Sequence, residues 1–479
     1  MLILLILIPI IAAAAIFTGS KARQTAQVAG LLNLIIGVGA ALSWKAGFWS
    51  MSLPMLEKPA INLSLGLIDG MSTIMLLLSV IVTFAALLSG KAPEGRERLY
   101  YGSSLLISAG AIGAFISTDL FFFYAFHELA LLPTFLMIGM LGRGERKLAA
   151  WKITIYLGFG SLILLAGLAW LAITTGTLDM TAMGAATIDP GTQKGIAALL
   201  IVGFGVLISL FPFHSWAAPA YASAPAPTAM LHAGVLKKFG LYGLLRLAVP
   251  LLPEGMNAWL VPLCVLLLGN ILWVGFVTIN QKRLDGMLGN SSVMHMGYIF
   301  LAIAAIAASP GNEKVLGIAV PAAVLLMFAH GISIAMLFGL ADRIERSTGT
   351  LDLEELGGLA KSAPKLAFFF GIVGMASIGL PGLANFAGEV MVFISSFTAY
   401  DPAEGLGPVQ ITCILAIWGV VISAVYMLRA YRNIFQGPAV PSTESAADLS
   451  MADRVPAILL AVVLFIVGIF PNILLGLFN

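Results

Sequence analysis

Runs of about 20 apolar residues recur along the whole chain, and each is long enough to cross a bilayer core of roughly 30 Å. Hydrophobic residues make up 60% of the 479 residues, charged residues only 10%, and the mean hydropathy is +1.01. These values exclude an ordinary water-soluble globular protein. We predict an all-α polytopic membrane protein in the lipid bilayer, with about 14 transmembrane helices centred near residues 9, 35, 80, 108, 130, 161, 203, 238, 268, 297, 328, 373, 420 and 466.

The charges that flank the runs predict their orientation. The first run, MLILLILIPIIAAAAIFTG, has no basic residue before it and is followed by Lys21 and Arg23. This order is the reverse of a cleavable signal peptide, so we predict a retained helix. Most lysines and arginines lie in loops after odd-numbered runs, whereas the even-numbered loops hold only Lys45, Lys58, Lys194 and Lys314. By the positive-inside rule, the odd loops face the cytoplasm or its equivalent, and both termini face the non-cytoplasmic side.

Two carboxylates, Glu128 and Glu389, lie in the middle of apolar runs. A charge at the centre of a membrane helix costs roughly 2.5 to 3.5 kcal/mol, so its retention needs a reason. Tyr124 and Asn385 each precede a carboxylate by four residues, which gives both acids an expected polar neighbour on the same helix face. The two carboxylates indicate proton or ion movement. A structural buried ion pair is the alternative for each.

A third run carries Lys238 near its middle, with Lys237 beside it and Gly234 one turn earlier. Snorkelling to the interface explains a lysine near a helix end, and here it suits Arg246 better than Lys238. Gly234 leaves room on this face for a neighbouring helix or for water. A buried ammonium responds to desolvation and to a nearby carboxylate, which suits a residue that holds and releases protons.

All five histidines fall within predicted spans or at their broken ends: His127, His214, His232, His295 and His330. A single buried histidine is usually a satisfied core residue. Five together favour proton transfer, because neutral imidazole both accepts and donates a proton near physiological pH. No two are spaced i, i+3 or i, i+4 and acids are few, so we predict no metal site. For Lys152, in the first turns of its helix, we expect interfacial anchoring.

Proline and glycine interrupt two apolar segments at comparable places, five helices apart: LISLFPFHSWAAPAYASAPAPTAM and MASIGLPGLANFAGE. Paired interruptions predict an internal repeat with two broken helices, whose free backbone groups line a hydrated path. Two proline-kinked helices without a repeat are the alternative. The loops contain no GxGxxG after a strand and no Walker-type glycine loop, so we expect no nucleotide site. We also expect no nucleic-acid partner.

Six motifs follow one another along the chain: FHELALLP, FPFHSW, AGVLKKFGLYGLLR, KRLDGMLGNSSVMHMGYIFL, AHGISIAMLFGLADRIE and GLPGLANFAGEVMVF. This order resembles the proton-pumping membrane subunits of complex I (NADH-quinone oxidoreductase), which are related to Mrp-type cation/proton antiporter subunits. The similarity runs from about Leu63 to Tyr431. Within the family the pattern is closest to subunit M, because Glu389 stands where L-type, N-type and Mrp subunits usually carry a lysine. The chain also ends soon after its fourteenth helix and lacks the long lateral helix of the L type.

The resemblance implies 14 helices, with spans 4 to 8 and 9 to 13 as two inverted five-helix repeats and with helices 7 and 12 broken. The implied regions are 1–95 (helices 1 to 3), 96–252 (first repeat), 253–435 (second repeat) and 436–479 (C-terminal loop and helix 14).

The family pattern also implies a proton path. Glu128 matches the carboxylate on the fifth helix, Lys238 the lysine on the eighth, His330 the histidine on the eleventh and Glu389 the exit-side carboxylate on the twelfth. Further candidates for proton transfer are Lys237, His295, His232 and His214.

Three positions depart from the family pattern. Leu207 replaces the usual lysine of the seventh helix, and Trp216 to Tyr221 read WAAPAY where the family has a run like WLPDAH. His127 stands where a tryptophan usually precedes the glutamate. Lys237 is the candidate to compensate for Leu207, although it belongs to another helix.

We therefore predict a membrane-arm subunit of a respiratory NADH:quinone oxidoreductase that translocates protons, driven by electron transfer elsewhere. We expect no redox centre on this chain, and NADH, FMN, iron–sulfur clusters and quinone on partner subunits. L-type and N-type subunits are the expected neighbours, in a bacterial or archaeal cell membrane. Three alternatives remain open. One is a multi-subunit Na⁺/H⁺ antiporter subunit, against which Glu389 counts. The others are a subunit of a hydrogenase- or F420H2-type membrane complex, and a non-pumping structural homologue, which Leu207 favours.

Overall fold

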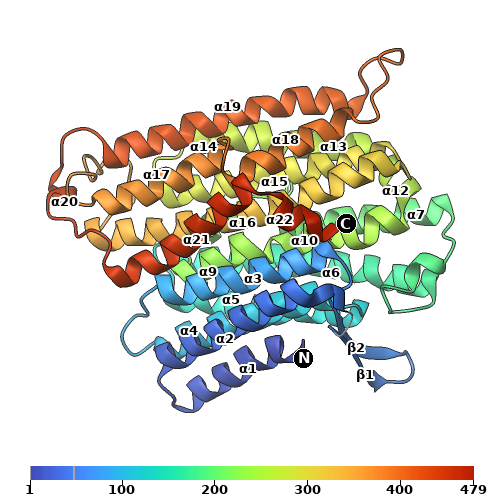
Figure 1. Ribbon diagram of the computed structural model, residues 1–479, viewed down its shortest axis with the longest axis horizontal. Coiled ribbons are helices and arrows are strands. Elements are labelled where there is room, and N and C mark those ends of the chain that lie inside the picture. The colour runs from blue at the N-terminus through green and yellow to red at the C-terminus, as the bar shows by residue number, and fades with distance from the viewer. Residues whose placement is uncertain (1, 47–48, 479) are drawn as a thin grey trace.

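The computed structural model describes residues 2–46 and 49–478. By length and composition, eleven helical segments in these residues can cross a membrane: α2 (Ala22–Ser43), α3 (Gly70–Ser89), α4 (Glu97–Ile116), α5 (Leu120–Leu141), α6 (Arg146–Thr175), α7 (Pro190–Ile208), Leu260–Ile279, α15 (Leu284–Ala308), α16 (Glu313–Thr348), α19 (Pro408–Phe435) and α21 (Met451–Ile469). Three apolar helices are shorter, namely α1 (Ile3–Thr18), α17 (Pro364–Ile378) and α18 (Ala384–Phe397). The chain is an integral membrane protein built mainly of helices (Figure 1).

Each centre predicted from hydropathy lies within a helix. The remaining α-helices are α8 (Ala217–Ser223), α9 (Ala226–Leu231), α10 (Lys238–Gly243), α11 (Val249–Leu251), α12 (Pro253–Ala258), α13 (Leu260–Leu268), α14 (Gly275–Ile279), α20 (Pro441–Glu444) and α22 (Asn472–Leu475). The number of membrane crossings, the inverted relation of the two five-helix groups and the region boundaries stay predictions.

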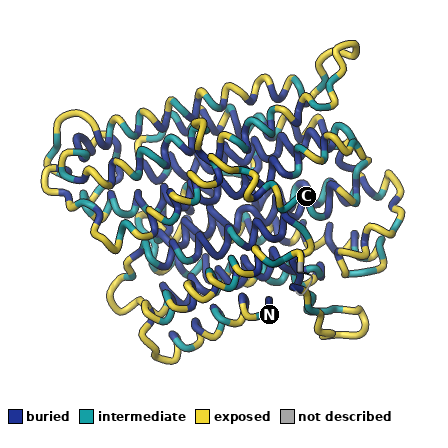
Figure 2. Tube along the Cα trace, viewed as in Figure 1, coloured by how far each residue is buried: buried dark blue, intermediate teal, exposed yellow. Residues whose placement is uncertain are grey.

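The core of the protein lies along α3, α4 and α15. In their most apolar stretches 83%, 89% and 94% of residues are buried, against 39% in α5 and in α6. Buried residues therefore concentrate in the middle of the bundle, and exposed apolar residues lie on its outer helices (Figure 2). In a bilayer such outer faces contact lipid or another membrane subunit.

Two helices are interrupted as predicted. The seventh consists of α7 and α8, separated by residues 209–216, and the twelfth of α17 and α18, separated by residues 379–383. Each first half ends at a residue in the left-handed region, Ser209 with φ of 67° and Gly379 with φ of 81°. A proline follows within three residues in both cases and cannot donate a helical hydrogen bond, so the backbone leaves the helix at these points.

Two other helices contain wider π-helical turns. In the eighth helix, His232–Leu236 and Leu244–Ala248 are π-helical and alternate with α9, α10 and α11. In the ninth, Gly269–Val274 joins α13 to α14 in the same way. Such turns displace backbone carbonyls from the regular ladder and are frequent at functional sites.

A short β-hairpin, which the sequence did not predict, lies between α2 and α3 in the otherwise helical fold. Strand β1 (Ser50–Leu56) pairs with β2 (Ile61–Gly66) in antiparallel register, with Leu53 opposite Leu63. Strand β2 is anchored to the connection between α4 and α5, because the Thr118 amide donates a hydrogen bond to the Ser64 carbonyl (2.9 Å). Strands this short lie between two strongly apolar runs, and a search for runs of about 20 residues passes over them.

The connections gather at two opposite ends of the bundle. In Figure 1 the α1–α2, α3–α4 and α19–α21 connections lie at the left, and the hairpin and the α18–α19 connection at the right. The loops after odd-numbered and even-numbered spans are thus on opposite sides, as the alternation of basic residues predicts. Which side faces the cytoplasm remains a prediction.

Candidate functional site

A lysine–histidine contact lies at the centre of the bundle. Lys238 Nζ lies 2.9 Å from His330 Nδ1 of α16 and 2.6 Å from the Ala233 carbonyl oxygen, and both side chains are buried. Ala233 belongs to the π-helical turn, which presents its carbonyl to the lysine. An ammonium at position 238 donates to Nδ1, and a neutral amine there accepts a proton from the imidazole. This contact is therefore suited to proton exchange.

The close approach of two helices makes this contact possible. A Cβ atom at Gly234 would lie 3.0 Å from the Gly331 carbonyl oxygen, and one at Gly331 would lie 2.6 Å from the Gly234 carbonyl oxygen. The two glycines therefore let the backbones of the eighth helix and α16 meet one turn from Lys238. The expectation that Gly234 admits a neighbouring helix is confirmed.

Lys237 points to a different group of residues. Its Nζ lies 3.4 Å from Ser292 Oγ of α15 and 5.7 Å from the ring centroid of Tyr221 in α8. His232 joins this group, because its Nδ1 lies 3.2 Å from the Tyr221 hydroxyl. The two adjacent lysines thus contact different helices: Lys238 contacts α16, whereas Lys237 contacts α15 and the second half of the broken seventh helix. Leu207 is buried near the end of the first half, α7.

His295 of α15 extends the central group toward the twelfth helix. The centroids of its ring and the His330 ring are 5.5 Å apart. His295 Nδ1 lies 2.8 Å from the Ser291 carbonyl oxygen, and Nε2 lies 3.0 Å from the Ser377 carbonyl oxygen of α17. Lys238, His330 and His295 thus form a continuous buried series that leads from the eighth helix to the break of the twelfth.

Glu128 lies apart from this series, and its side chain is 34% exposed. Ser161 Oγ of α6 donates to Glu128 Oε1 (2.6 Å), and His127 Nδ1 lies 3.3 Å from the same oxygen. Tyr124, the expected neighbour, instead donates to the Ser161 carbonyl. Within residues 2–46 and 49–478, no hydrogen bond or ion pair joins Glu128 to either central lysine. Glu128 and Lys238, which the family pattern assigns to the same proton path, are therefore not in direct contact.

An aromatic contact joins the helix of Glu128 to the helix of the lysines. The His127 ring stacks on the Phe239 ring at a centroid distance of 4.1 Å, and Phe239 follows Lys238 in the sequence. Histidine at position 127 therefore touches both the carboxylate and the Phe239 ring.

Glu389 of α18 lies against the break of the twelfth helix and is 4% exposed. Its carboxylate occupies the space that a Cβ atom at Gly379 would need, so glycine at that position admits the acid. Asn385, the expected neighbour, instead donates to Ser333 Oγ of α16 (3.4 Å). In the described part of the chain, the Glu389 carboxylate accepts no hydrogen bond.

Polar cavities open at the end of the bundle that carries the odd-numbered loops. One cavity of about 700 Å³ is lined by His214, Asn280, Gln281 and Asn290, and a neighbouring one of about 620 Å³ by Lys152 and Arg143. His214 lies in the break of the seventh helix, so this break is accessible from the odd-loop end.

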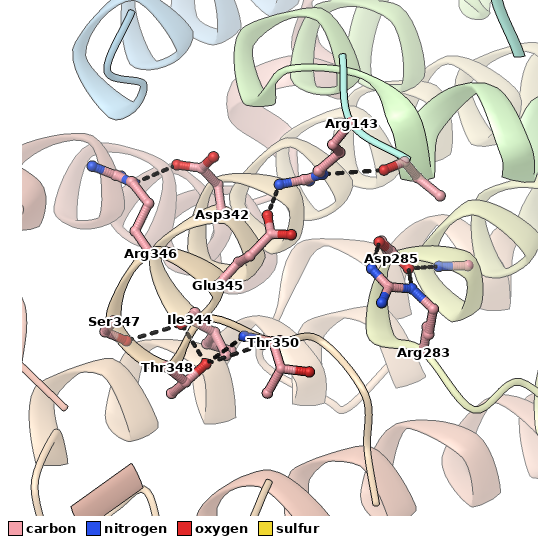
Figure 3. A network of polar contacts seen from close by, with 12 residues as sticks. Arg143, Arg283, Asp285, Asp342, Ile344, Glu345, Arg346, Ser347, Thr348 and Thr350 are labelled. Atoms are coloured by element: carbon pink, nitrogen blue, oxygen red, sulfur yellow. Dashed lines mark hydrogen bonds and ion pairs between the residues drawn. The ribbon is translucent and has the colours of Figure 1, made fainter. Parts of the chain in front are cut away.

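Charged residues beside these cavities tie several helices together. Arg143, in the α5–α6 connection, pairs with Glu345 of α16 and donates from Nε to the Ala222 carbonyl (3.2 Å) at the end of α8. On the next turn of α16, Arg346 pairs with Asp342 (2.7 Å) (Figure 3). The network fixes the odd-loop end of α16, the helix that carries His330.

Sequence reasoning did not identify several polar residues of the site. Ser161, Tyr221 and Ser292 each contact one of the predicted ionisable side chains, but they lie on other helices. No spacing along the sequence brings them together. The Ser377 carbonyl is different, because a proline four residues later, Pro381, already shows that this carbonyl lacks a helical donor.

Comparison with known proteins gives a consistent result. The family described as NADH:quinone oxidoreductase/Mrp antiporter, transmembrane, matches residues 117–404. NAD(P)H-quinone oxidoreductase chain 4 of Microcystis aeruginosa is 34% identical over 88% of this chain and 75% of its own length. The F(420)H(2) dehydrogenase subunit M of Methanosarcina mazei is 31% identical over 98% of this chain and 94% of its own length. A chain of respiratory complex I from Thermus thermophilus superposes over the whole of both chains with a TM-score of 0.88 and 26% identity.

Proposed function

The chain belongs to the NADH:quinone oxidoreductase/Mrp antiporter family of membrane subunits, and from this premise we propose that it translocates protons as a membrane-arm subunit of an NAD(P)H:quinone oxidoreductase. The observation that carries the proposal is the buried Lys238–His330 contact, which is poised for proton exchange. Ionisable residues within membrane spans are typical of proton relays.

Each residue in the path has a chemical role in the proposal. Lys238 and His330 exchange a proton over 2.9 Å, and His295 carries the relay on to the break of the twelfth helix. Glu389 releases the proton from its site beside Gly379. Lys237, with Tyr221 and His232, supplies the proton-holding amine of the first repeat, in place of the lysine that Leu207 replaces.

Glu128 takes the role of a coupling group at the surface. A carboxylate one-third exposed on an apolar membrane face is costly in lipid, which supports an adjacent subunit covering this face. Neighbouring L-type and N-type subunits fit that position in the proposal. The redox chemistry of NADH, FMN, iron–sulfur clusters and quinone would then belong to partner subunits, and both termini would face the non-cytoplasmic side of a bacterial or archaeal membrane.

One observation supports an alternative electron donor. The F(420)H(2) dehydrogenase subunit is aligned over 98% of this chain, so F420H2 is the alternative donor for the same proton-translocating role. Purifying the assembled complex and identifying its electron-input subunit distinguishes the two donors. Glu389 in place of a lysine counts against a free-standing Na⁺/H⁺ antiporter.

The test is Lys238→Met in the assembled complex, in inverted membrane vesicles. We expect proton uptake and coupled quinone reduction to fall together by about a factor of ten or more, because proton transfer by a positioned side chain typically contributes at least this much. Glu389→Gln should lower both in the same way. Lys314→Met, at an exposed lysine, is the control and should change neither. Normal pumping in the assembled Lys238→Met complex would show that the central pair is structural and that the subunit does not use it.

A further inference from the structure

The two helix breaks end their first halves with the same backbone pattern. At the seventh helix, the Ser209 amide donates to the Val206 carbonyl and the Leu210 amide to the Gly205 carbonyl. At the twelfth, the Gly379 amide donates to the Ala376 carbonyl and the Leu380 amide to the Met375 carbonyl. Both patterns are typical of helix C-termini, and both leave the last carbonyls without a donor from the same helix. At membrane depth, such carbonyls need partners from elsewhere.

At the seventh helix, the partner is an amide side chain. Asn270, in the π-helical turn of the ninth helix, accepts from the Phe211 amide (2.7 Å) and donates to the carbonyls of Ser209 (3.1 Å) and Val293 (2.9 Å). An amide does not titrate in the physiological range. These three contacts therefore persist whatever the local proton occupancy.

At the twelfth helix, the partner is a titratable side chain. The helical donor to the Ser377 carbonyl would be residue 381, which is proline and has no N–H. His295 Nε2 occupies this place at 3.0 Å from the Ser377 oxygen. The end of α17 is thus held by an imidazole of α15.

The second nitrogen of His295 makes this contact dependent on charge. Nδ1 lies 2.8 Å from the Ser291 carbonyl oxygen, so a carbonyl acceptor faces each side of the ring. A neutral imidazole has a single N–H, whereas an imidazolium has two. Only the protonated ring satisfies both carbonyls, and loss of its proton turns a lone pair toward one of them.

When His295 loses its proton, the hydrogen bond to the Ser377 carbonyl breaks and the contact with the Ser291 carbonyl stays. Ser291 belongs to the same helix as His295, so their separation is fixed by α15. The imidazole is 1% exposed and packed between the rings of Tyr298 and His330, which leaves it little room to turn. The break that follows α17 is exposed at residues 380–382 and contains two glycines with positive φ, Gly379 and Gly382. A small displacement of this segment costs less than rotation of the buried ring.

Both acidic and basic titratable groups surround His295. Lys238 and His330 face it from the eighth helix and α16, and both oppose a positive charge when they are protonated. The titratable groups that the packed elements bring toward His295 are Tyr221 of α8, Lys237 and Lys238 of the eighth helix, His330 of α16, Glu389 of α18, Tyr426 of α19 and Tyr298 of α15 itself. Arrival of a proton at His295 is therefore favoured when the Lys238–His330 pair has released one.

We propose that His295 is a positioning residue that ties the end of α17 through its proton: the imidazolium bridges the Ser291 and Ser377 carbonyls, and deprotonation frees the break beside Glu389. The step is a simple proton transfer, in which the N–H bond of the imidazolium breaks and the proton passes to the Glu389 carboxylate, the next group of the proposed path. Its use in translocation rests on the proposed function. The bridge itself does not.

The test measures the break directly, in membranes that contain the whole complex. In a background of Cys264→Ala and Cys413→Ala, a cysteine at the exposed Leu380 reports on the twelfth-helix break, and one at Phe213 reports on the seventh. Labelling rates with N-ethylmaleimide are measured from pH 5 to 9 and divided by the rate of Leu406→Cys in the exposed α18–α19 connection. This ratio removes the intrinsic pH dependence of the thiol.

We expect the Leu380→Cys ratio to rise with pH by about fivefold to tenfold, as the loss of one ordinary hydrogen bond predicts. The Phe213→Cys ratio should stay flat, because Asn270 holds that break. His295→Gln should flatten the Leu380→Cys profile, and Glu389→Gln should leave its rise intact. If His295→Gln does not assemble, the Leu380→Cys and Phe213→Cys labelling ratios in the complex with native His295 still test the proposal.

A flat Leu380→Cys profile, or an equal rise at both breaks, overturns the proposal. A rise that persists in His295→Gln and vanishes in Glu389→Gln assigns the effect to the carboxylate and also overturns it. Failure of the proposed function is distinguishable, because it appears as unchanged proton uptake in Lys238→Met while the labelling profile keeps its pH dependence.

Discussion

At the scale of single residues, two adjacent lysines have different contacts. Lys237 and Lys238 are both fully buried, yet the first contacts Ser292 and the Tyr221 ring and the second contacts His330. Two ammonium groups next to each other in an apolar core repel, which favours side chains that point to different partners.

The role of Lys237 can be tested by exchanging residues. Lys237→Leu should lower proton uptake by about a factor of ten, because the first half of the chain loses its central amine. Adding Leu207→Lys to this variant should recover a substantial part of the loss, since it returns an amine to the seventh helix. Vesicle proton uptake at matched complex content is the measurement. Leu207→Lys alone should leave activity intact or raise it. If the double variant takes up protons no faster than Lys237→Leu, Lys237 does not take the place of the seventh-helix lysine.

At the scale of elements, the crossing of the eighth helix and α16 sets the distance between donor and acceptor. The carbonyl oxygen of each of the two glycines, Gly234 and Gly331, packs against the other glycine. The π-helical turn at this crossing provides the Ala233 carbonyl to Lys238. A helix kept regular through this turn would hydrogen-bond that carbonyl within its own ladder. The crossing and the irregular turn together build the contact.

Gly331→Ala tests this crossing. The new methyl group would lie 2.6 Å from the Gly234 oxygen and 2.7 Å from Leu78 Cδ1, so the helices must separate, at a cost of about 1–3 kcal/mol. We expect a lower apparent Tm of the solubilised protein and reduced proton uptake, since the Lys238–His330 distance grows. Gly317→Ala, on the same helix with nothing within 4 Å, is the matched control and should be neutral or slightly stabilising. If the two variants have equal apparent Tm and proton uptake, the crossing has room for the added methyl group and the tight-packing account is wrong.

At the scale of the whole molecule, polar ties outside the spans join parts of the chain that are distant in sequence. Arg246, at the end of the eighth helix, forms two hydrogen bonds with Asp69 (2.7 and 2.8 Å), which caps α3 through the Ser72 amide. The tie joins the N-terminal helices to the first predicted repeat. At the other end of the bundle, the Arg143–Glu345 pair joins the α5–α6 connection to α16.

The Asp69 tie has a defined pH dependence. Burial alone would raise the pKa of Asp69, but the hydrogen bonds and charge of Arg246, with the hydrogen bonds from Ser72, outweigh it and hold this pKa below its usual value. A depressed carboxylate pKa stabilises the fold above the unfolded-state pKa of about 4, and this stability is lost as pH falls through the folded-state value.

Asp69→Asn should therefore lower the apparent Tm most at neutral pH and by a shrinking amount below about pH 4. Because the Asp69 side chain is 38% exposed, we expect a loss of only about 1 kcal/mol. Thermal unfolding of the detergent-solubilised protein at pH 7 and pH 3.5 is the measurement, and Asp401→Asn in the α18–α19 connection is the control. A Tm difference that is equal at both pH values would contradict the electrostatic account.

Hydropathy and residue type alone determined that this chain is a helical membrane protein, where its helices lie and which two helices break. Membrane spans are long, and each must satisfy its own backbone, so their signal is local in sequence. Charged and titratable residues stand out against such apolar spans, which is why the sequence alone marked Glu128, Lys238, His330 and Glu389 as candidates. The motif order indicated the family, which the comparisons confirm.

Only the tertiary structure decided which candidates meet. It joined Lys238 to His330 and His295 to Ser377, turned Lys237 toward Tyr221, and separated Glu128 from both lysines. These contacts cross between helices whose register depends on glycine crossings and π-helical turns, and no pattern within one helix encodes them. The hairpin was also beyond the sequence pattern, because its pairing with the α4–α5 link is a contact between distant segments.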